Sequence, residues 1–80
     1  MKKITERCTY KSQTIKESNY NFETLSLIIK FLDGISYEYL GVSEMAYESF
    51  SRADSIGKSF TRLIRFNYKG KKIEIENEIN

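Results

Sequence analysis

The pattern that most constrains the fold lies in residues 25–40, which read as a β-hairpin. Apolar residues alternate along 25–32, as expected for a strand with one buried face. Asp33-Gly34 follows, a dipeptide favoured in two-residue type I′ turns because both central residues need φ > 0. Residues 35–40 then form the return strand, and Gly41 ends it.

The length of this turn determines which side chains share a face of the sheet. A two-residue turn pairs Lys30 with Tyr37 and Ile28 with Tyr39. Both tyrosines would then lie beside Lys30, on a second apolar face that the N-terminal arm, another subunit or a ligand must cover. This second face would be extended by Ile28, Leu32 and Ile35. The better core face would carry Leu27, Ile29 and Phe31.

Two short helices are predicted after the hairpin, over about 43–53 and 58–67. Ser43 is a good N-cap for the first helix. Residues 71–76 alternate as a further strand, residues 13–20 are a weaker strand candidate, and residues 1–12 form an edge strand or a loose arm. The order of elements predicts one α+β domain over residues 1–80. Its small antiparallel sheet, the hairpin 25–40 plus flanking strands, would have both helices packed on one face.

Composition excludes several kinds of site and stabilising link. Cys8 is the only cysteine and no histidine is present, so we expect no internal disulfide, no zinc site of the usual ligand type, and no other cofactor. A domain of 80 residues buries a modest core, so a homo-oligomer is expected. The apolar run at 25–32 is too short to cross a bilayer, and residues 1–7 contain no apolar signal-peptide core. We therefore expect a cytoplasmic protein that does not bind membranes.

Charge is distributed unevenly along the chain, although the formal net charge is only +2. Residues 31–51 contain four acidic side chains and no Lys or Arg, whereas residues 52–72 contain seven Lys or Arg against the single acid Asp54. A local basic block of this kind suits phosphate groups or an acidic surface on a partner, including the acidic segment of a second copy.

The order and spacing of many residues match a known family. They are Leu27, Ile29, Phe31, Gly34, Tyr37, Tyr39, Val42, Tyr47, Phe50, Ala53, Ser55, Gly57, Phe60, Ile64, Arg65 and Tyr68, with Ser12 and Ile15 upstream. On these residues the chain resembles the KTSC domain, which is named for a C-terminal extension of some lysyl-tRNA synthetases. Ser36, Ser43, Ser59 and Thr61 depart from the residues usual in that family. The resemblance implies a small α+β fold, and a role in RNA binding has been suggested for the family.

Tyr37 and Tyr39 form the first candidate binding surface. With Lys30 beside them, they could be a stacking platform for a base, with a cation nearby for phosphate. The alternative is that both tyrosines are half-buried under the N-terminal segment or a partner subunit, because an apolar patch more often marks a covered or protein-contacting surface.

A basic stripe is the second candidate. Lys58, Arg62, Arg65 and Lys69 are spaced i, i+4, i+7 and i+11, which places them along one side of a helix. They could bind phosphates, with each Arg able to donate two parallel hydrogen bonds. The alternative is the solvated face of an ordinary amphipathic helix.

The segment Gly57-Lys58-Ser59 resembles part of a P-loop but is not one. The first glycine of that motif would fall at position 52, which is Arg52, and no strand precedes it. A weaker possibility is an anion held by free backbone N–H groups at the start of the second helix, with Ser55 or Ser59 helping. No paired carboxylates stand out, and Cys8 has no identifiable base, so we expect no enzyme.

The residues together favour a non-enzymatic small binding domain for a phosphate-bearing ligand, either nucleic acid or a small nucleotide, which it could sequester. The residues expected to bind it are Lys58, Arg62, Arg65 and Lys69 for phosphate, and Tyr37 and Tyr39 for stacking, with Lys30 in support. The alternative is a protein-interaction or inhibitor module that acts through the apolar tyrosine face of the sheet.

Overall fold

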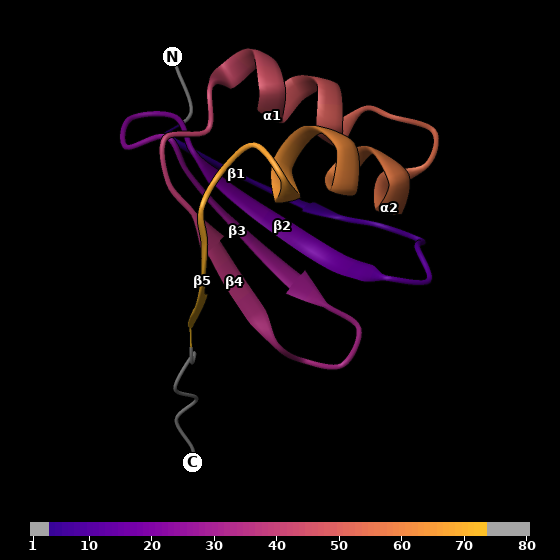
Figure 1. Cartoon of the computed structure of the whole chain (residues 1–80). Coiled ribbons are helices and arrows are strands. Elements are labelled where there is room, and N and C mark those ends of the chain that lie inside the picture. Colours follow the sequence, from indigo (N-terminus) through magenta and orange to yellow (C-terminus); the bar gives the residue numbers. More distant parts are fainter. Residues whose placement is uncertain (1–3, 74–80) are drawn as a thin grey trace.

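A computed structural model of the chain describes residues 4–73 as one antiparallel sheet with a helical layer on one face (Figure 1). The strands are β1 (Thr5–Thr9), β2 (Ile15–Asn21), β3 (Ser26–Phe31), β4 (Ser36–Tyr39) and β5 (Gly70–Ile73). They lie in the order β1-β2-β3-β4-β5, and every neighbouring pair is antiparallel. The predicted α+β class is therefore confirmed, and β1 is an edge strand. The later part of the predicted strand 71–76 falls outside the described residues.

The β3–β4 hairpin has a different register from the predicted one. Ile29 pairs with Tyr37 and Leu27 with Tyr39, because the loop contains three residues rather than two. The Gly34 N–H donates to the Phe31 carbonyl at 2.9 Å, and within the loop only Gly34 has a positive φ, +91°. A three-residue loop with glycine in the left-handed region is a common alternative to the type I′ turn.

This shift of one residue moves both tyrosines to the opposite face, because side chains alternate along a strand. Tyr37 and Tyr39 lie on the same face as Leu27 and Ile29, beneath the helical layer. Lys30 pairs with Ser36 and points to the other face. The prediction that the tyrosines share a face with Lys30 was wrong.

The open face of the sheet is mostly polar, so the predicted second apolar face does not form. Alternation from the observed register places Ile28 there among polar neighbours, and the Ser26 hydroxyl donates to the Glu38 carboxylate at 2.7 Å beside it. Leu32 is exposed at the hairpin loop.

The hydrophobic core lies between the sheet and the helices. Tyr20 and Tyr47 stack in it with ring centroids 4.2 Å apart, and the Tyr20 hydroxyl donates to the Val42 carbonyl at 2.6 Å. The buried apolar residues are Ile15, Tyr20, Leu27, Ile29, Tyr39, Val42, Tyr47, Phe50, Phe60 and Ile64.

The first helix, α1 (Glu44–Ser51), begins where the sequence predicts, because the Ser43 side chain accepts a hydrogen bond from the Ala46 N–H at 3.1 Å. The second helical segment begins with α2 (Ile56–Ser59), two residues before the predicted start. It continues without a break as a π-helical turn, η1 (Phe60–Arg65). It therefore ends before Lys69, which precedes β5.

None of the helices in the described part of the chain is long and apolar enough to cross a membrane. Within residues 4–73 there is also no group of three or more His, Cys, Asp or Glu side chains arranged to hold a metal ion.

Candidate functional site

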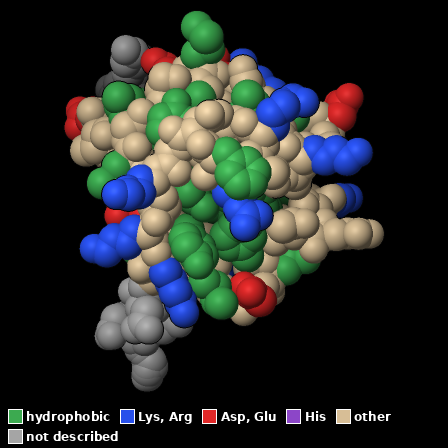
Figure 2. Space-filling model, in the orientation of Figure 1, with side chains coloured by type: hydrophobic (Ala, Val, Ile, Leu, Met, Phe, Trp, Pro, Cys, Tyr) green, Lys and Arg blue, Asp and Glu red, His purple; other side chains and the backbone are tan. Residues whose placement is uncertain are grey.

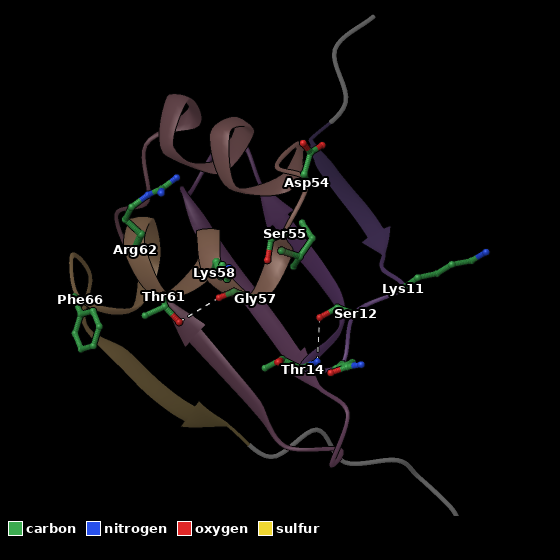
Figure 3. Close-up of a pocket in the computed structure, with 12 residues that line it drawn as sticks. Lys11, Ser12, Thr14, Asp54, Ser55, Gly57, Lys58, Thr61, Arg62 and Phe66 are labelled. Atoms are coloured by element: carbon green, nitrogen blue, oxygen red, sulfur yellow. Dashed lines mark hydrogen bonds between the residues drawn. The ribbon is translucent and has the colours of Figure 1, made fainter.

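A pocket of about 790 Å³ lies where the β1–β2 loop meets the start of the second helical segment (Figure 3). Two stretches distant in sequence form it, residues 11–14 from the loop and residues 54–66 from the helical segment. Its lining residues are Lys11, Ser12, Gln13, Thr14, Asp54, Ser55, Ile56, Gly57, Lys58, Thr61, Arg62 and Phe66.

The loop wall is shaped by Ser12. Its hydroxyl oxygen accepts hydrogen bonds from the backbone N–H groups of Thr14 at 3.0 Å and Ile15 at 3.2 Å. Because a hydroxyl carries its own proton, Ser12 can still donate a hydrogen bond to a ligand. The Leu32 N–H donates to the Thr14 carbonyl at 3.0 Å, which ties this loop to the end of β3.

The loop and the helical segment come close together at Gly57. A methyl group at Gly57 would lie 3.4 Å from the Thr14 hydroxyl oxygen, so the two segments are already close together. Ser55 precedes α2 and makes no side-chain capping hydrogen bond, so its hydroxyl is not engaged there. The backbone N–H groups of the first helical turn have no acceptor within the helix.

Thr61 and Ser59 use their hydroxyls within the protein. Thr61 donates to the Gly57 carbonyl at 3.2 Å, and Ser59, only 2% exposed, donates to the Phe50 carbonyl at 3.1 Å. Of the two serines proposed as anion ligands from the sequence, the pocket therefore contains only Ser55.

The charge of the pocket lining is positive. Lys11, Lys58 and Arg62 stand against the single acid Asp54. The ion pairs among the described residues join Arg7 to Glu17 and Arg52 to Glu48, so Lys58 and Arg62 are not neutralised by an ion pair there. In Figure 3 the Lys11 side chain extends away from the helices, which leaves Lys58 and Arg62 as the main cations of the helical wall.

Phe66 lies at the edge of the pocket and is 74% exposed. The Arg65 guanidinium carbon is 5.4 Å from the centre of the Phe66 ring, within the range of a cation–π interaction. Phe66 follows η1 directly, so it sits on the same helical segment as Arg62 and Thr61.

The predicted phosphate residues are only partly brought together. Lys58 and Arg62 line the pocket, Arg65 lies against Phe66, and Lys69 is not in the lining. The single stripe was expected from α-helical spacing, but a π-helical turn rotates Arg65 away, and the helix ends before Lys69. Figure 2 shows the face of the molecule seen in Figure 1, where Lys and Arg side chains are separated from one another and hydrophobic side chains are exposed among them.

The predicted stacking residues do not reach the pocket. Tyr39 is 5% exposed and contacts Phe60 with ring centroids 5.7 Å apart, and Tyr37 contacts Phe31 at 6.0 Å. Burial raises the pKa of Tyr39, and the nearby charge of Arg65 partly offsets that rise. Lys30 lies on the opposite face of the sheet.

Several lining residues were not predicted from the sequence to bind a ligand. They are Lys11, Ser12, Thr14, Gly57, Thr61 and Phe66. Ser12 carried a signal only as a position of the family resemblance, and Gly57 as such a position and as part of the segment that resembles a P-loop. Phe66 carried a weak one, because it is a large apolar residue between Arg65 and Asn67 that fits no helical core spacing.

A second polar cluster joins β1 to α1. The Tyr47 hydroxyl donates to the Glu6 carboxylate at 2.5 Å and lies 3.5 Å from the Cys8 sulfur. Burial, together with this hydrogen bond to Glu6, raises the pKa of Tyr47. The cluster holds β1 against the helix, and none of its members lines the pocket.

Comparison with known proteins places the pocket inside a family match. The family model of the KTSC domain matches residues 11–68, which include every lining residue. The crystal structure of a KTSC domain protein from Yersinia pestis is similar, with 31% sequence identity and a TM-score of 0.81. That similarity covers 88% of this chain and 99% of the Yersinia pestis chain. No curated protein matches the chain.

Proposed function

The chain belongs to the KTSC domain family, and we propose that it is a non-enzymatic domain that binds a phosphate-bearing ligand, a nucleic acid or a small nucleotide. The proposed site is the pocket between the β1–β2 loop and α2. The observation that carries this proposal is the position of Lys58 and Arg62, two cations without an ion-pair partner among the described residues, in a pocket also lined by hydroxyl donors.

Charge supports an anion over a neutral ligand. Three cations and one carboxylate line the pocket, so the formal net charge of its side chains is +2. Arg62 can donate two parallel hydrogen bonds to phosphate oxygens, and Lys58 contributes a compact charge. Both side chains are exposed, so we expect their attraction for an anion to be screened by salt.

Hydrogen-bond donors support phosphate within that class. Ser12 retains its hydroxyl proton, and the Ser55 hydroxyl makes no capping bond. Phosphate oxygens accept several hydrogen bonds at once, which suits a lining with more donors than acceptors.

The residue types of the lining favour binding without turnover. The pocket lining contains no cysteine or histidine, and Asp54 is its single carboxylate. A Ser or Thr nucleophile usually needs an adjacent general base, most often a histidine. A domain that binds without turnover would act by sequestering its ligand.

The protein-interaction alternative would need another surface. It was based on Tyr37 and Tyr39 sharing an open face with Ile28, and the observed register separates them. We therefore propose no second function on that face.

Isothermal titration calorimetry with ADP and with a single-stranded oligoadenylate tests the phosphate site. The double variant Lys58→Ala plus Arg62→Ala should weaken binding of both probes about tenfold or more, because charged hydrogen bonds are lost. Binding by the wild-type protein should also weaken steeply as salt is raised.

The matched control is Arg7→Ala plus Lys71→Ala. It also removes one arginine and one lysine, but both are on the open face of the sheet, opposite the helices. The proposal fails if the two double variants bind equally well, or if the wild-type protein binds neither probe.

A further inference from the structure

Resting on the phosphate site proposed above, we propose that Phe66 stacks against an unpaired nucleobase. The ligand class is then a base-bearing phosphate rather than a bare phosphate or a sugar phosphate. Mononucleotides and single-stranded nucleic acids share this chemistry. The proposal stands on the juxtaposition of an exposed aromatic ring, the Arg62 cation and one pocket.

The exposure of Phe66 alone would be weak evidence for a binding site, because single apolar residues are common on protein surfaces. Leu40 and Met45 are also exposed, for example, and neither lines this pocket. Phe66 differs because its ring borders the pocket that contains Lys58 and Arg62. A flat aromatic face beside a phosphate-binding cation is the arrangement by which proteins bind unpaired bases without reading their sequence.

The helical segment fixes this position without burying the ring. The Asn67 side-chain amide donates to the Arg62 carbonyl at 3.1 Å and to the Leu63 carbonyl at 3.0 Å. The Tyr68 N–H also donates to the Ile64 carbonyl at 3.0 Å. The turn that carries Phe66 is therefore held by its backbone and by Asn67, so the ring can remain 74% exposed.

The π-helical turn contributes to the geometry. Its hydrogen bonds join residues five apart, so Thr61 and Phe66 come to lie on the same side of the segment. Both line the pocket together with Arg62. An uninterrupted α-helix would instead continue the stripe toward Lys69 and rotate residue 66 relative to Thr61.

Arg65 completes the platform. Its guanidinium carbon lies 5.4 Å from the ring centre of Phe66. A cation on one side of the ring restricts its rotation, and the exposure of the ring leaves area for a base. Arg62 would then bind the phosphate attached to the stacked base, because it lines the same pocket as Phe66.

The test uses the fact that the chain contains no tryptophan. The variant Phe66→Trp introduces a single indole at the platform, and stacking of a base on it should quench its fluorescence. The probes are ADP, adenosine, ribose 5-phosphate and a single-stranded oligoadenylate. ADP, adenosine and the oligonucleotide should quench the fluorescence, whereas ribose 5-phosphate should not.

Affinity measurements with Phe66→Ala complete the test. We expect about tenfold weaker binding of ADP and of the oligoadenylate, with ribose 5-phosphate unchanged. The control Met45→Ala removes a similarly exposed apolar side chain from α1 (78% exposed) and should change none of these affinities. Tighter binding of the oligonucleotide than of ADP would identify a single-stranded nucleic acid as the source of the base. Tighter binding of ADP would identify a small nucleotide.

The outcomes separate this inference from the proposed phosphate site. If Lys58→Ala plus Arg62→Ala removes ADP binding while Phe66→Ala leaves it unchanged, the phosphate site stands and the stacking inference is overturned. Equal weakening of ADP and ribose 5-phosphate by Phe66→Ala would also overturn it, since Phe66 would only shape the pocket. If adenosine quenches the indole but no phosphate-bearing probe binds more tightly than adenosine, the stacking stands and the phosphate site fails.

Discussion

Gly70 is the residue that lets β5 pair with β4. It faces Tyr39 across the ladder, and a Cβ at this position would overlap the Tyr39 ring. The ring cannot easily yield, because Tyr39 is buried and contacts Phe60 at its edge. The absence of a side chain at Gly70 is therefore a packing requirement.

We predict that Gly70→Ala lowers the free energy of unfolding by about 1–3 kcal/mol, the usual cost of forcing extra atoms into a packed core. Gly57→Ala is the matched control, because its methyl group would only make ordinary contact with Thr14. Since alanine favours helices more than glycine, we expect the control to raise stability by about 0.5–1 kcal/mol. Urea unfolding measures both variants. Equal stability of the two would contradict the packing described for Tyr39.

Alternation in the sequence predicted part of this core. Leu27 and Ile29 are buried as expected, because strand alternation does not depend on the partner strand. The faces of Tyr37 and Tyr39 do depend on the partner strand, through the loop length. Phe66 was not predicted as a site residue, because its proposed role depends on the pocket that it borders more than on its neighbours along the chain.

The hairpin shows at the scale of the element why the register was mispredicted. Asp33-Gly34 is compatible with both a two-residue and a three-residue loop, so the dipeptide does not determine the pairing. In the observed loop, the Asp33 side chain accepts the Ile35 N–H at 2.9 Å, and Asp33 itself has no positive φ. Asp33 therefore stabilises the longer loop through its side chain.

The variant Asp33→Gly distinguishes the two loops. In the observed loop it removes the hydrogen bond and adds chain entropy, so we predict a loss of about 1 kcal/mol in the free energy of unfolding. In a type I′ turn, glycine at this position would instead relieve a positive φ and raise stability. Thermal unfolding compares Asp33→Gly with Asp33→Asn, which keeps the acceptor oxygen and should remain close to the wild type.

The end of η1 depends on Asn67 in a similar way. We predict that Asn67→Ala lowers the free energy of unfolding by about 1 kcal/mol, because the Arg62 and Leu63 carbonyls lose a side-chain donor. Asn67→Asp should cost more, since a carboxylate cannot donate and is repelled by the negative end of a helix. Chemical unfolding monitored by circular dichroism measures both. If Asn67→Asp is the more stable variant, the side chain does not cap these carbonyls.

At the scale of the whole molecule, the order of elements was enough to predict the α+β class. Hydrophobic periodicity and helix caps are local signals, so the helices and strands that they predict do not depend on the register of the sheet. The pocket, in contrast, is formed by residues that are far apart in the sequence. It needs residues 11–14 to lie against residues 54–66, and that contact arises only when β2 enters the sheet beneath the helices. The charge pattern therefore predicted Lys58 and Arg62, which line the pocket, but nothing in the sequence pointed to the loop that faces them.

The tyrosines of the core give the whole molecule a predicted response to alkaline pH. Burial raises the pKa of Tyr20, Tyr39 and Tyr47, and it raises the pKa of Tyr10 to about 12, outweighing the opposing hydrogen bond from Ser18. In the unfolded chain, tyrosine loses its proton near pH 10. Above about pH 10 the unfolded state thus binds fewer protons than the native state, and stability falls as pH rises.

We therefore predict full stability below about pH 10 and a progressive loss between about pH 10 and 12, measured as the urea midpoint at each pH. Tyrosinate absorbance recorded in parallel should rise together with unfolding, because buried tyrosines ionise only when the core opens. Tyr10→Phe removes one of the groups that stay protonated in the native state, so its stability should fall less steeply with pH. A urea midpoint that stays constant across this range would mean that the tyrosine hydroxyls ionise within the folded protein, and that burial does not hold their protons.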